Sequence, residues 1–232
     1  MTFASPALRC MLIAALLGAT GSARAQWAWG VSLLSDDRFR GVSLSAGQPD
    51  LRLSLAYENL AGWFGGTALS TAEFDAGRRD AALFSYAGYA QRASATLSWE
   101  LGGSIAHFAA DPSYDYLEVF AGVAAEQWNL RVFGSPSYFG GGVRTLYVEA
   151  NGHVPLAGAW RLFGHAGQLS GLGGDRRGGT PRSRFDASVG VGADLRGWSW
   201  QLAWVCAPQS TLYPVADNEH RNSVTISASH YF

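Results

Sequence analysis

Apolar and polar residues alternate with a period of two through most of the chain. The last segment shows this most clearly, because one set of alternate positions holds Val224, Ile226, Ala228, His230 and Phe232, and the other set is polar. Successive residues of a strand point to opposite faces, so this spacing predicts a β-strand with one apolar and one polar face.

The same alternation, interrupted by turn residues, predicts twelve strands. They are expected near residues 27–36, 50–58, 62–74, 80–92, 97–108, 115–125, 128–136, 144–154, 159–169, 184–194, 197–207 and 222–232. All seven prolines after residue 25 fall at or beyond the ends of these segments, where they remove no hydrogen bond from a sheet. Short connections alternate with longer ones, and the longest are near 37–49, 170–182 and 208–221.

An even number of strands joined alternately by short turns and long loops is typical of bacterial outer-membrane proteins. The chain also ends on Phe232 inside its last strand, which resembles the closing strand that the barrel-assembly machinery reads in such proteins. We therefore predict an all-β fold, a closed antiparallel transmembrane β-barrel of about 12 strands. The alternative for the last segment is an ordinary edge strand of a soluble protein.

Aromatic residues mark one predicted rim of this barrel. Tryptophans open every second strand, directly after a short turn, and the terminal phenylalanine reaches the same rim: Trp27, Trp29, Trp63, Trp99, Trp128, Trp160, Trp198, Trp200 and Phe232. Indole concentrates where hydrocarbon meets lipid headgroups, so this set is predicted to be the periplasmic aromatic girdle. The rival is a soluble barrel with tryptophan in its core.

The faces opposite the predicted lipid-facing residues are polar and partly charged, which predicts a polar interior. The candidates for a lumen constriction are Glu118, Arg131, Glu149, His153, Arg161 and His165. Opposite charges on neighbouring strands are expected to pair, because an isolated buried ion is costly. Two interpretations stay open: a charged, water-filled constriction that selects solutes, or a salt-bridged plug that fills a narrow barrel.

The N-terminus has the three parts of a secretory signal. Arg9 is followed by an apolar run over 11–18 and by Ala23-Arg24-Ala25, which predicts a signal peptide over 1–25 and a mature barrel over 26–232. Export to the bacterial outer membrane is therefore expected. Cys206 then stands alone, so no disulfide framework is predicted.

The chain contains no lysine, so arginine supplies its positive charge. After residue 25, 15 arginines face 18 acidic residues, and this net charge of −3 argues against nucleic-acid binding. Ten of these arginines lie in or beside the long loops, and those expected to face lipopolysaccharide phosphates include Arg78, Arg79, Arg176 and Arg177. The alternative is a set of solvated loop charges.

The segment from Ser35 to Ser43, which contains Phe39-Arg40-Gly41, carries a family resemblance together with Gln48-Pro49 and the strand that follows. It resembles the N-terminal pattern of the TorF-type porins, also called the Gcw family of bacterial outer-membrane proteins. The resemblance implies an outer-membrane barrel of poorly known transport role, and it implies no catalytic residues.

We therefore predict a porin or channel for the passive diffusion of small solutes, with no enzyme activity, cofactor or metal. The alternatives are a structural or lipid-interacting barrel without transport and an outer-membrane lipid hydrolase. His107 would suit a hydrolase by its outward direction near the external rim, but no G-x-S-x-G elbow accompanies it. No Cys/His spacing suggests a metal site.

Overall fold

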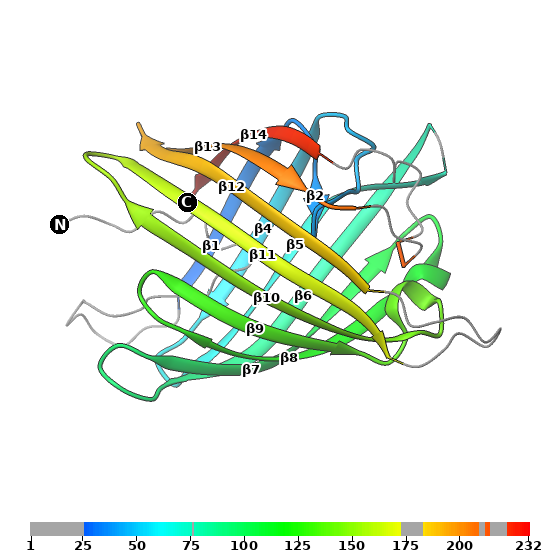
Figure 1. Ribbon diagram of the computed structural model, residues 1–232, viewed down its shortest axis with the longest axis horizontal. Coiled ribbons are helices and arrows are strands. Elements are labelled where there is room, and N and C mark those ends of the chain that lie inside the picture. The colour runs from blue at the N-terminus through cyan, green and yellow to red at the C-terminus, as the bar shows by residue number, and fades with distance from the viewer. Residues whose placement is uncertain (1–25, 76, 173–182, 209–211, 214–221) are drawn as a thin grey trace.

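Twelve antiparallel strands form a closed barrel in the computed structural model, which describes residues 26–75, 77–172, 183–208, 212–213 and 222–232 (Figure 1). The sheet closes because β1 pairs with β4 on one side and with β14 on the other. The barrel strands are β1 (Gln26–Leu34), β4 (Asp50–Glu58), β5 (Trp63–Asp75), β6 (Arg78–Arg92), β7 (Ser98–Phe108), β8 (Tyr116–Ala124), β9 (Trp128–Ser135), β10 (Arg144–Pro155), β11 (Trp160–Leu172), β12 (Ser183–Leu195), β13 (Trp198–Cys206) and β14 (Asn222–Tyr231).

The predicted fold class is confirmed, and each predicted strand coincides with one of these twelve to within about three residues at either end. Short connections gather at the end of the barrel where β1 begins, here called the turn end. Longer connections gather at the opposite loop end, except that β5 and β6 are joined there by two residues, although the sequence predicts a longer connection. The predicted signal peptide, residues 1–25, lies outside the described residues.

The outer face of the barrel is apolar along its strands. Leu51, Leu53 and Leu55 alternate on β4 and are all exposed, and Leu117 and Val119 do the same on β8. Exposed tryptophans lie at or near the turn end of β1, β5, β7, β9, β11 and β13: Trp27, Trp29, Trp63, Trp99, Trp128, Trp160 and Trp200. Trp198, the first residue of β13, is half-buried against the ring of His230. A contiguous apolar band of this extent is unsuited to water.

The seam between β1 and β14 is the shortest run of pairing in the barrel. It contains five residue pairs, from Gly30 with Tyr231 to Leu34 with Ser227. Phe232 extends this seam beyond the strand, because its N–H donates to the Trp29 carbonyl at 2.9 Å and its ring stacks on the Trp29 indole with centroids 3.8 Å apart. The terminal aromatic therefore stabilises the closure of the barrel.

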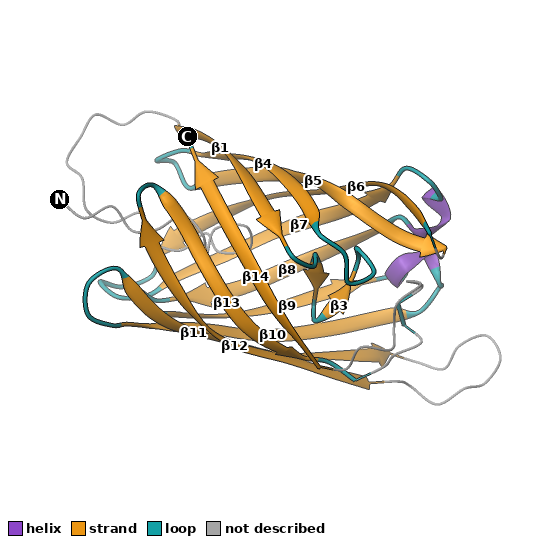
Figure 2. Cartoon of the chain, turned by 90° about the horizontal axis from the view of Figure 1, so that it is seen from above, coloured by secondary structure: helices purple, strands orange, loops and turns teal. Residues whose placement is uncertain are grey.

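A small hairpin of β2 (Arg38–Phe39) and β3 (Val42–Ser43) stands apart from the barrel sheet (Figure 2). It belongs to residues 35–49, which the sequence places among the external loops. That expectation is wrong, because the hairpin contacts inward side chains of β6, β8, β9 and β10. We call residues 35–49 the lumen loop.

Among the described residues, helical structure is limited to two single turns at the loop end, η2 (Pro112–Tyr114) and η3 (Tyr138–Gly140). Across the part of the chain that the structure describes, no helix has the length and apolar character needed to traverse a bilayer.

Deleting Phe232 should weaken closure of the barrel, since it removes one backbone hydrogen bond and the Trp29 stack at a five-pair seam. We expect a lower yield of the folded form and a lower temperature of heat-induced mobility change on gels. Phe232→Tyr, which keeps the ring and the backbone, is the matched control. A truncated chain that folds and melts like the full chain would contradict this role.

Candidate functional site

The tip of the lumen loop is a two-residue turn formed by Arg40 and Gly41. Both have positive φ, 49° and 75°, as the tight turn between two antiparallel strands requires. Gly41 also lies against the barrel wall, because a Cβ placed on it would be 2.6 Å from the Ala207 Cβ and 3.0 Å from the Asp186 Cβ. The turn therefore needs glycine for both its backbone and its surroundings.

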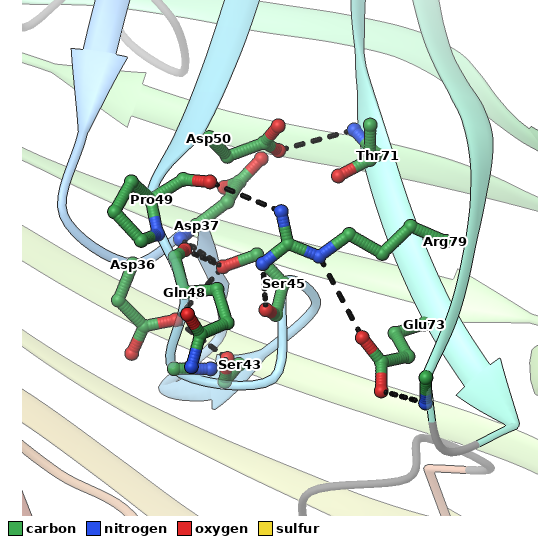
Figure 3. Close-up of polar contacts among 12 residues, drawn as sticks. Asp36, Asp37, Ser43, Ser45, Gln48, Pro49, Asp50, Thr71, Glu73 and Arg79 are labelled. Carbon is green, nitrogen blue, oxygen red and sulfur yellow. Dashed lines mark hydrogen bonds and ion pairs between the residues drawn. The ribbon is translucent and has the colours of Figure 1, made fainter.

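Short polar side chains hold the lumen loop in its folded form (Figure 3). The Ser43 hydroxyl donates to Asp36 at 2.5 Å, and the Ser45 hydroxyl donates to the Gln48 carbonyl at 2.7 Å while it accepts the Asp37 N–H at 2.9 Å. The motif on which the family resemblance rests is thus the set of residues that folds this loop.

The base of the lumen loop is tied to β4, β5 and β6. Arg79 on β6 donates to the carbonyls of Ser45 and Pro49 at 2.7 and 3.1 Å, and it pairs with Glu73 at 3.6 Å (Figure 3). The Glu73 N–H donates to the Leu44 carbonyl at 2.8 Å, and Arg52 forms an ion pair with the buried Asp37. The base is therefore held by several independent contacts.

Arg40 holds the tip across the lumen. Its guanidinium donates to both oxygens of Glu118 on β8, at 2.8 and 2.7 Å, and to the Tyr138 hydroxyl at 3.0 Å. The guanidinium carbon also lies 4.0 Å from the ring centroid of Tyr147 and 5.0 Å from that of Phe133. Cation–π contacts and a two-point ion pair together fix this side chain.

Aromatic side chains fill the lumen around the tip. The buried cluster joins residues of the lumen loop and η3 with inward residues of β5, β7, β8, β9, β10 and β11: Phe39, Val42, Leu44, Phe64, Phe108, Tyr116, Phe120, Phe133, Tyr138, Phe139, Tyr147 and Leu169. The interior around the tip therefore combines the predicted charged side chains with a large apolar cluster. The lumen loop gives these inward aromatics an apolar surface to pack against.

Burial of the inward charges shows how tightly the lumen is filled at this level. Glu118, Arg131, Glu149 and Asp186 are each at most 5% exposed, and Tyr147 is fully buried. Side chains lining an open, water-filled passage would be accessible to water along that passage. The lumen loop and the aromatic cluster therefore exclude water beside these residues.

The predicted lumen residues do point inward, but their partners differ from those expected. Arg131 lies opposite Glu149 in the pairing of β9 with β10, yet its ion pair is with Glu100 on β7, across the intervening strand. Glu149 accepts a hydrogen bond from Asn151 at 3.3 Å. Arg161 pairs with Asp194 on the adjacent β12 at 2.9 Å, as expected for neighbouring strands.

His165 belongs to a second polar group in the lumen. Its Nε2 lies 2.7 Å from Asp186 and its Nδ1 lies 2.7 Å from the Asn151 side-chain oxygen. The Tyr147 hydroxyl donates to the same Asp186 carboxylate at 3.2 Å. His153 lies apart from this group, near the turn end of β10, where its N–H donates to the Gln127 carbonyl.

The site residues that the sequence interpretation missed are Arg40 as a lumen residue, Tyr147, Asp186, Arg184 and Tyr213. Tyr147 and Asp186 have inward parity on their strands, so alternation places them in the lumen without indicating a role. The signal for Arg40 is the pair Arg40-Gly41 between the apolar residues Phe39 and Val42, since a glycine in a two-residue connection between apolar residues is typical of a tight hairpin turn.

The outer surface and the loops hold the other candidates. His107 lies half-exposed with its Nδ1 2.6 Å from Asp115. Arg78 is exposed and pairs with Asp80, whereas Arg79 is occupied by the lumen loop. Arg176 and Arg177 lie outside the described residues.

A closed antiparallel barrel with an apolar outer band and paired charges inside defines the transmembrane β-barrel class. Within this class, the chain belongs to a family of bacterial proteins of unknown function, Gcw_chp, whose model matches residues 18–228. No curated protein matches the chain at a significant level.

Solved structures share the fold at low sequence identity. KdgM porin is similar with a TM-score of 0.56 and 10% identity over 88% of this chain and 99% of its own. KdgM porin in complex with disordered oligogalacturonate gives 0.54 and 9% identity over 90% and 99%. A membrane-protein structure from work on in-meso crystallization gives 0.51 and 11% identity over 89% and 83%.

Replacing Arg40 with methionine should release the lumen loop, because it leaves the Glu118 carboxylate buried among aromatic rings without its cation. Breaking one partner of a buried pair costs about 3–5 kcal/mol. We expect hydrogen exchange of the amides of residues 37–45 to accelerate in Arg40→Met while exchange in β12 and β13 stays unchanged. The double variant Arg40→Met/Glu118→Gln should recover part of the protection. Equal exchange in wild type and Arg40→Met would show that the ion pair does not hold the loop.

Proposed function

We propose that this chain is an outer-membrane barrel of the porin type, a passive channel for small solutes whose lumen is narrowed by residues 35–49. Two features together support this proposal. The outer face of the barrel carries an apolar band suited to lipid, and the interior holds ion pairs around the separate hairpin of β2 and β3. A barrel that served only as an anchor would need no hairpin held by charges. The likeness in fold to KdgM porin agrees with this class.

In this arrangement the lumen loop and the aromatic cluster fill the lumen around Arg40, so we propose that passage requires the tip of the lumen loop to move. The tip is held across the lumen by the Arg40–Glu118 pair, whereas the base is held to β4, β5 and β6 by several contacts. Displacement of the tip alone would expose the inward charges of β8 to β11. We propose that the pathway would then pass Glu118, Arg131, Glu149, His153, Arg161 and His165.

A barrel without transport, serving a structural or lipid-interacting role, is the second candidate, and the filled lumen favours it. The two candidates differ in whether the lumen loop can leave the lumen while the barrel stays folded. Within the first candidate, we propose the finer class of TorF-type porins, export directed by residues 1–25, and insertion by the barrel-assembly machinery through β14 and Phe232.

Contacts with the outer leaflet belong to the same proposal. Arg78, exposed at the loop end beside Asp80, would meet lipopolysaccharide phosphates. Arg79 is less suited to that role because its donors serve the carbonyls of Ser45 and Pro49. Arg176 and Arg177 stay candidates from their place in the sequence.

Removing residues 38–43 should open the channel. We expect single-channel recordings in planar bilayers to show a steady conductance for the deletion variant and a smaller or intermittent one for the wild type. Arg78→Gln, which alters an exposed arginine of the loop end, is the control and should conduct like the wild type. A folded deletion variant that carries no current would favour the barrel without transport.

The depth of the aromatic rim in the bilayer provides a separate test of how the barrel lies in the membrane. Trp63, Trp128 and Trp160 each open a strand at the turn end, with exposed side chains. In single-tryptophan variants reconstituted in lipid, we expect brominated acyl chains to quench the three fluorescence signals to similar extents and at similar depths. Unquenched or widely different signals would contradict a shared girdle.

A further inference from the structure

In the described part of the chain, every buried arginine in the lumen except one forms an ion pair with a carboxylate. Among the described residues, four arginines are buried, and three of these form ion pairs, which join Arg40 to Glu118, Arg131 to Glu100 and Arg161 to Asp194. The fourth is Arg184, which is only 4% exposed. No carboxylate in the described part of the chain lies within ion-pair distance of its guanidinium. An uncompensated buried charge is strongly unfavourable, so the exception needs a physical reason.

The surroundings of Arg184 leave part of its guanidinium unused. The residue lies near the loop end of β12, opposite the fully buried Leu169, so its side chain points inward. Its guanidinium carbon lies 4.7 Å from the ring centroid of Tyr213. Its Nε and Nη1 are buried and have no hydrogen-bond partner among the described residues. Its Nη2 lies 3.7 Å from the position a Cβ on Gly41 would occupy, so the group borders the turn of the lumen hairpin.

Two described groups beside Arg184, Asp186 and Tyr213, already have other hydrogen-bond partners. Asp186, two positions along the same face of β12, directs its carboxylate to Tyr147 and His165. The Tyr213 hydroxyl accepts a hydrogen bond from Tyr138 at 3.1 Å. Burial raises the pKa of Tyr213, so this phenol stays neutral and offers no counter-charge. Among the described residues, Arg184 is therefore a buried cation whose Nε and Nη1 have no partner, and it lies next to the part of the lumen loop that we propose to move.

We propose that Arg184, backed by Tyr213 and the turn at Gly41, binds the oxyanion group of a small solute, either a carboxylate or a phosphate. A guanidinium suits both groups, because its donors are fixed in one plane and its charge does not depend on pH. This proposal concerns binding at equilibrium, and it does not require the solute to cross the membrane.

The unoccupied protein provides the first test. Arg131→Gln leaves the buried Glu100 without its cation and should lower the temperature of heat-induced mobility change. Arg184→Gln removes a charge that has no ion-pair partner among the described residues, so this temperature should stay the same or rise in buffer without added oxyanion. If Arg184→Gln lowered it as much as Arg131→Gln, the charge of Arg184 would already be balanced within the chain, and the proposal would be overturned.

Anion addition provides the second test. At constant ionic strength set with sodium chloride, we expect acetate or inorganic phosphate to raise the wild-type transition temperature saturably, and neutral acetamide to leave it unchanged. Arg184→Gln should weaken the effect about tenfold or more, as expected for the loss of charge-assisted hydrogen bonds. Arg92→Gln, which alters an exposed arginine at the turn end of β6, should respond like the wild type.

The relative effects of the two anions identify the ligand class, since a response to acetate alone indicates carboxylates and a response to phosphate alone indicates phosphates. Arg184→Lys, which keeps the charge but not the planar donors, should bind at intermediate strength and replaces the glutamine variant if that chain does not fold. No saturable response to either anion in the wild type, or full affinity in a folded Arg184 variant, would rule the site out.

Discussion

A guanidinium enclosed by aromatic rings requires a carboxylate, and the pairing of Arg40 with Glu118 meets this requirement at the centre of the barrel. Each partner alone would be a buried charge in a surrounding of Phe133, Tyr138 and Tyr147. Together they form a two-point ion pair with side chains that are at most 4% exposed. Since the pair joins the tip of the lumen loop to β8, the position of the loop and the packing of the aromatic cluster both depend on it.

Glycine on the inward face makes these long-range contacts possible. Arg131 reaches Glu100 across β8 at Gly122, where a Cβ would lie 2.9 Å from both the Arg131 Cγ and a Glu100 carboxylate oxygen. The hydroxyl of Tyr147 likewise occupies the space over Gly167, where a Cβ would be 2.0 Å away. A narrow barrel can therefore hold large inward side chains only where the neighbouring strand presents no side chain of its own.

The fold could be predicted from the sequence because alternation, turn residues and proline positions are local signals. Strand positions and the inward direction of Glu118, Arg131 and Glu149 follow from parity alone. The lumen loop could not be placed in this way. Its serines, aspartates and arginines have the composition of a solvated loop, and their partners come from strands more than thirty residues away, such as Glu118 for Arg40 and Arg79 for Ser45. Non-local pairing of this kind leaves no period in the sequence. For the same reason Arg131 could be assigned to the lumen but not to Glu100.

The base of the lumen loop is held by more contacts than its tip, and this difference suggests which part would move if the barrel opened. The base has a backbone hydrogen bond from Glu73, two side-chain hydrogen bonds from Arg79 and the Arg52–Asp37 pair. The tip depends on the Arg40–Glu118 ion pair, the hydrogen bond from Arg40 to Tyr138 and aromatic packing. Its turn at Gly41 borders Arg184, which has no ion-pair partner among the described residues. An anion that settles on Arg184 would add negative charge beside the turn that presents Arg40, and so compete with Glu118 for that cation. A ligand shifts the equilibrium between the closed and open positions of the lumen loop only by the difference in its affinity for the two. Such an anion would therefore favour the open position only if Arg40, once freed from Glu118, helps to bind it more strongly. The anion site and the Arg40–Glu118 pair are thus electrostatically coupled through the tip of the lumen loop.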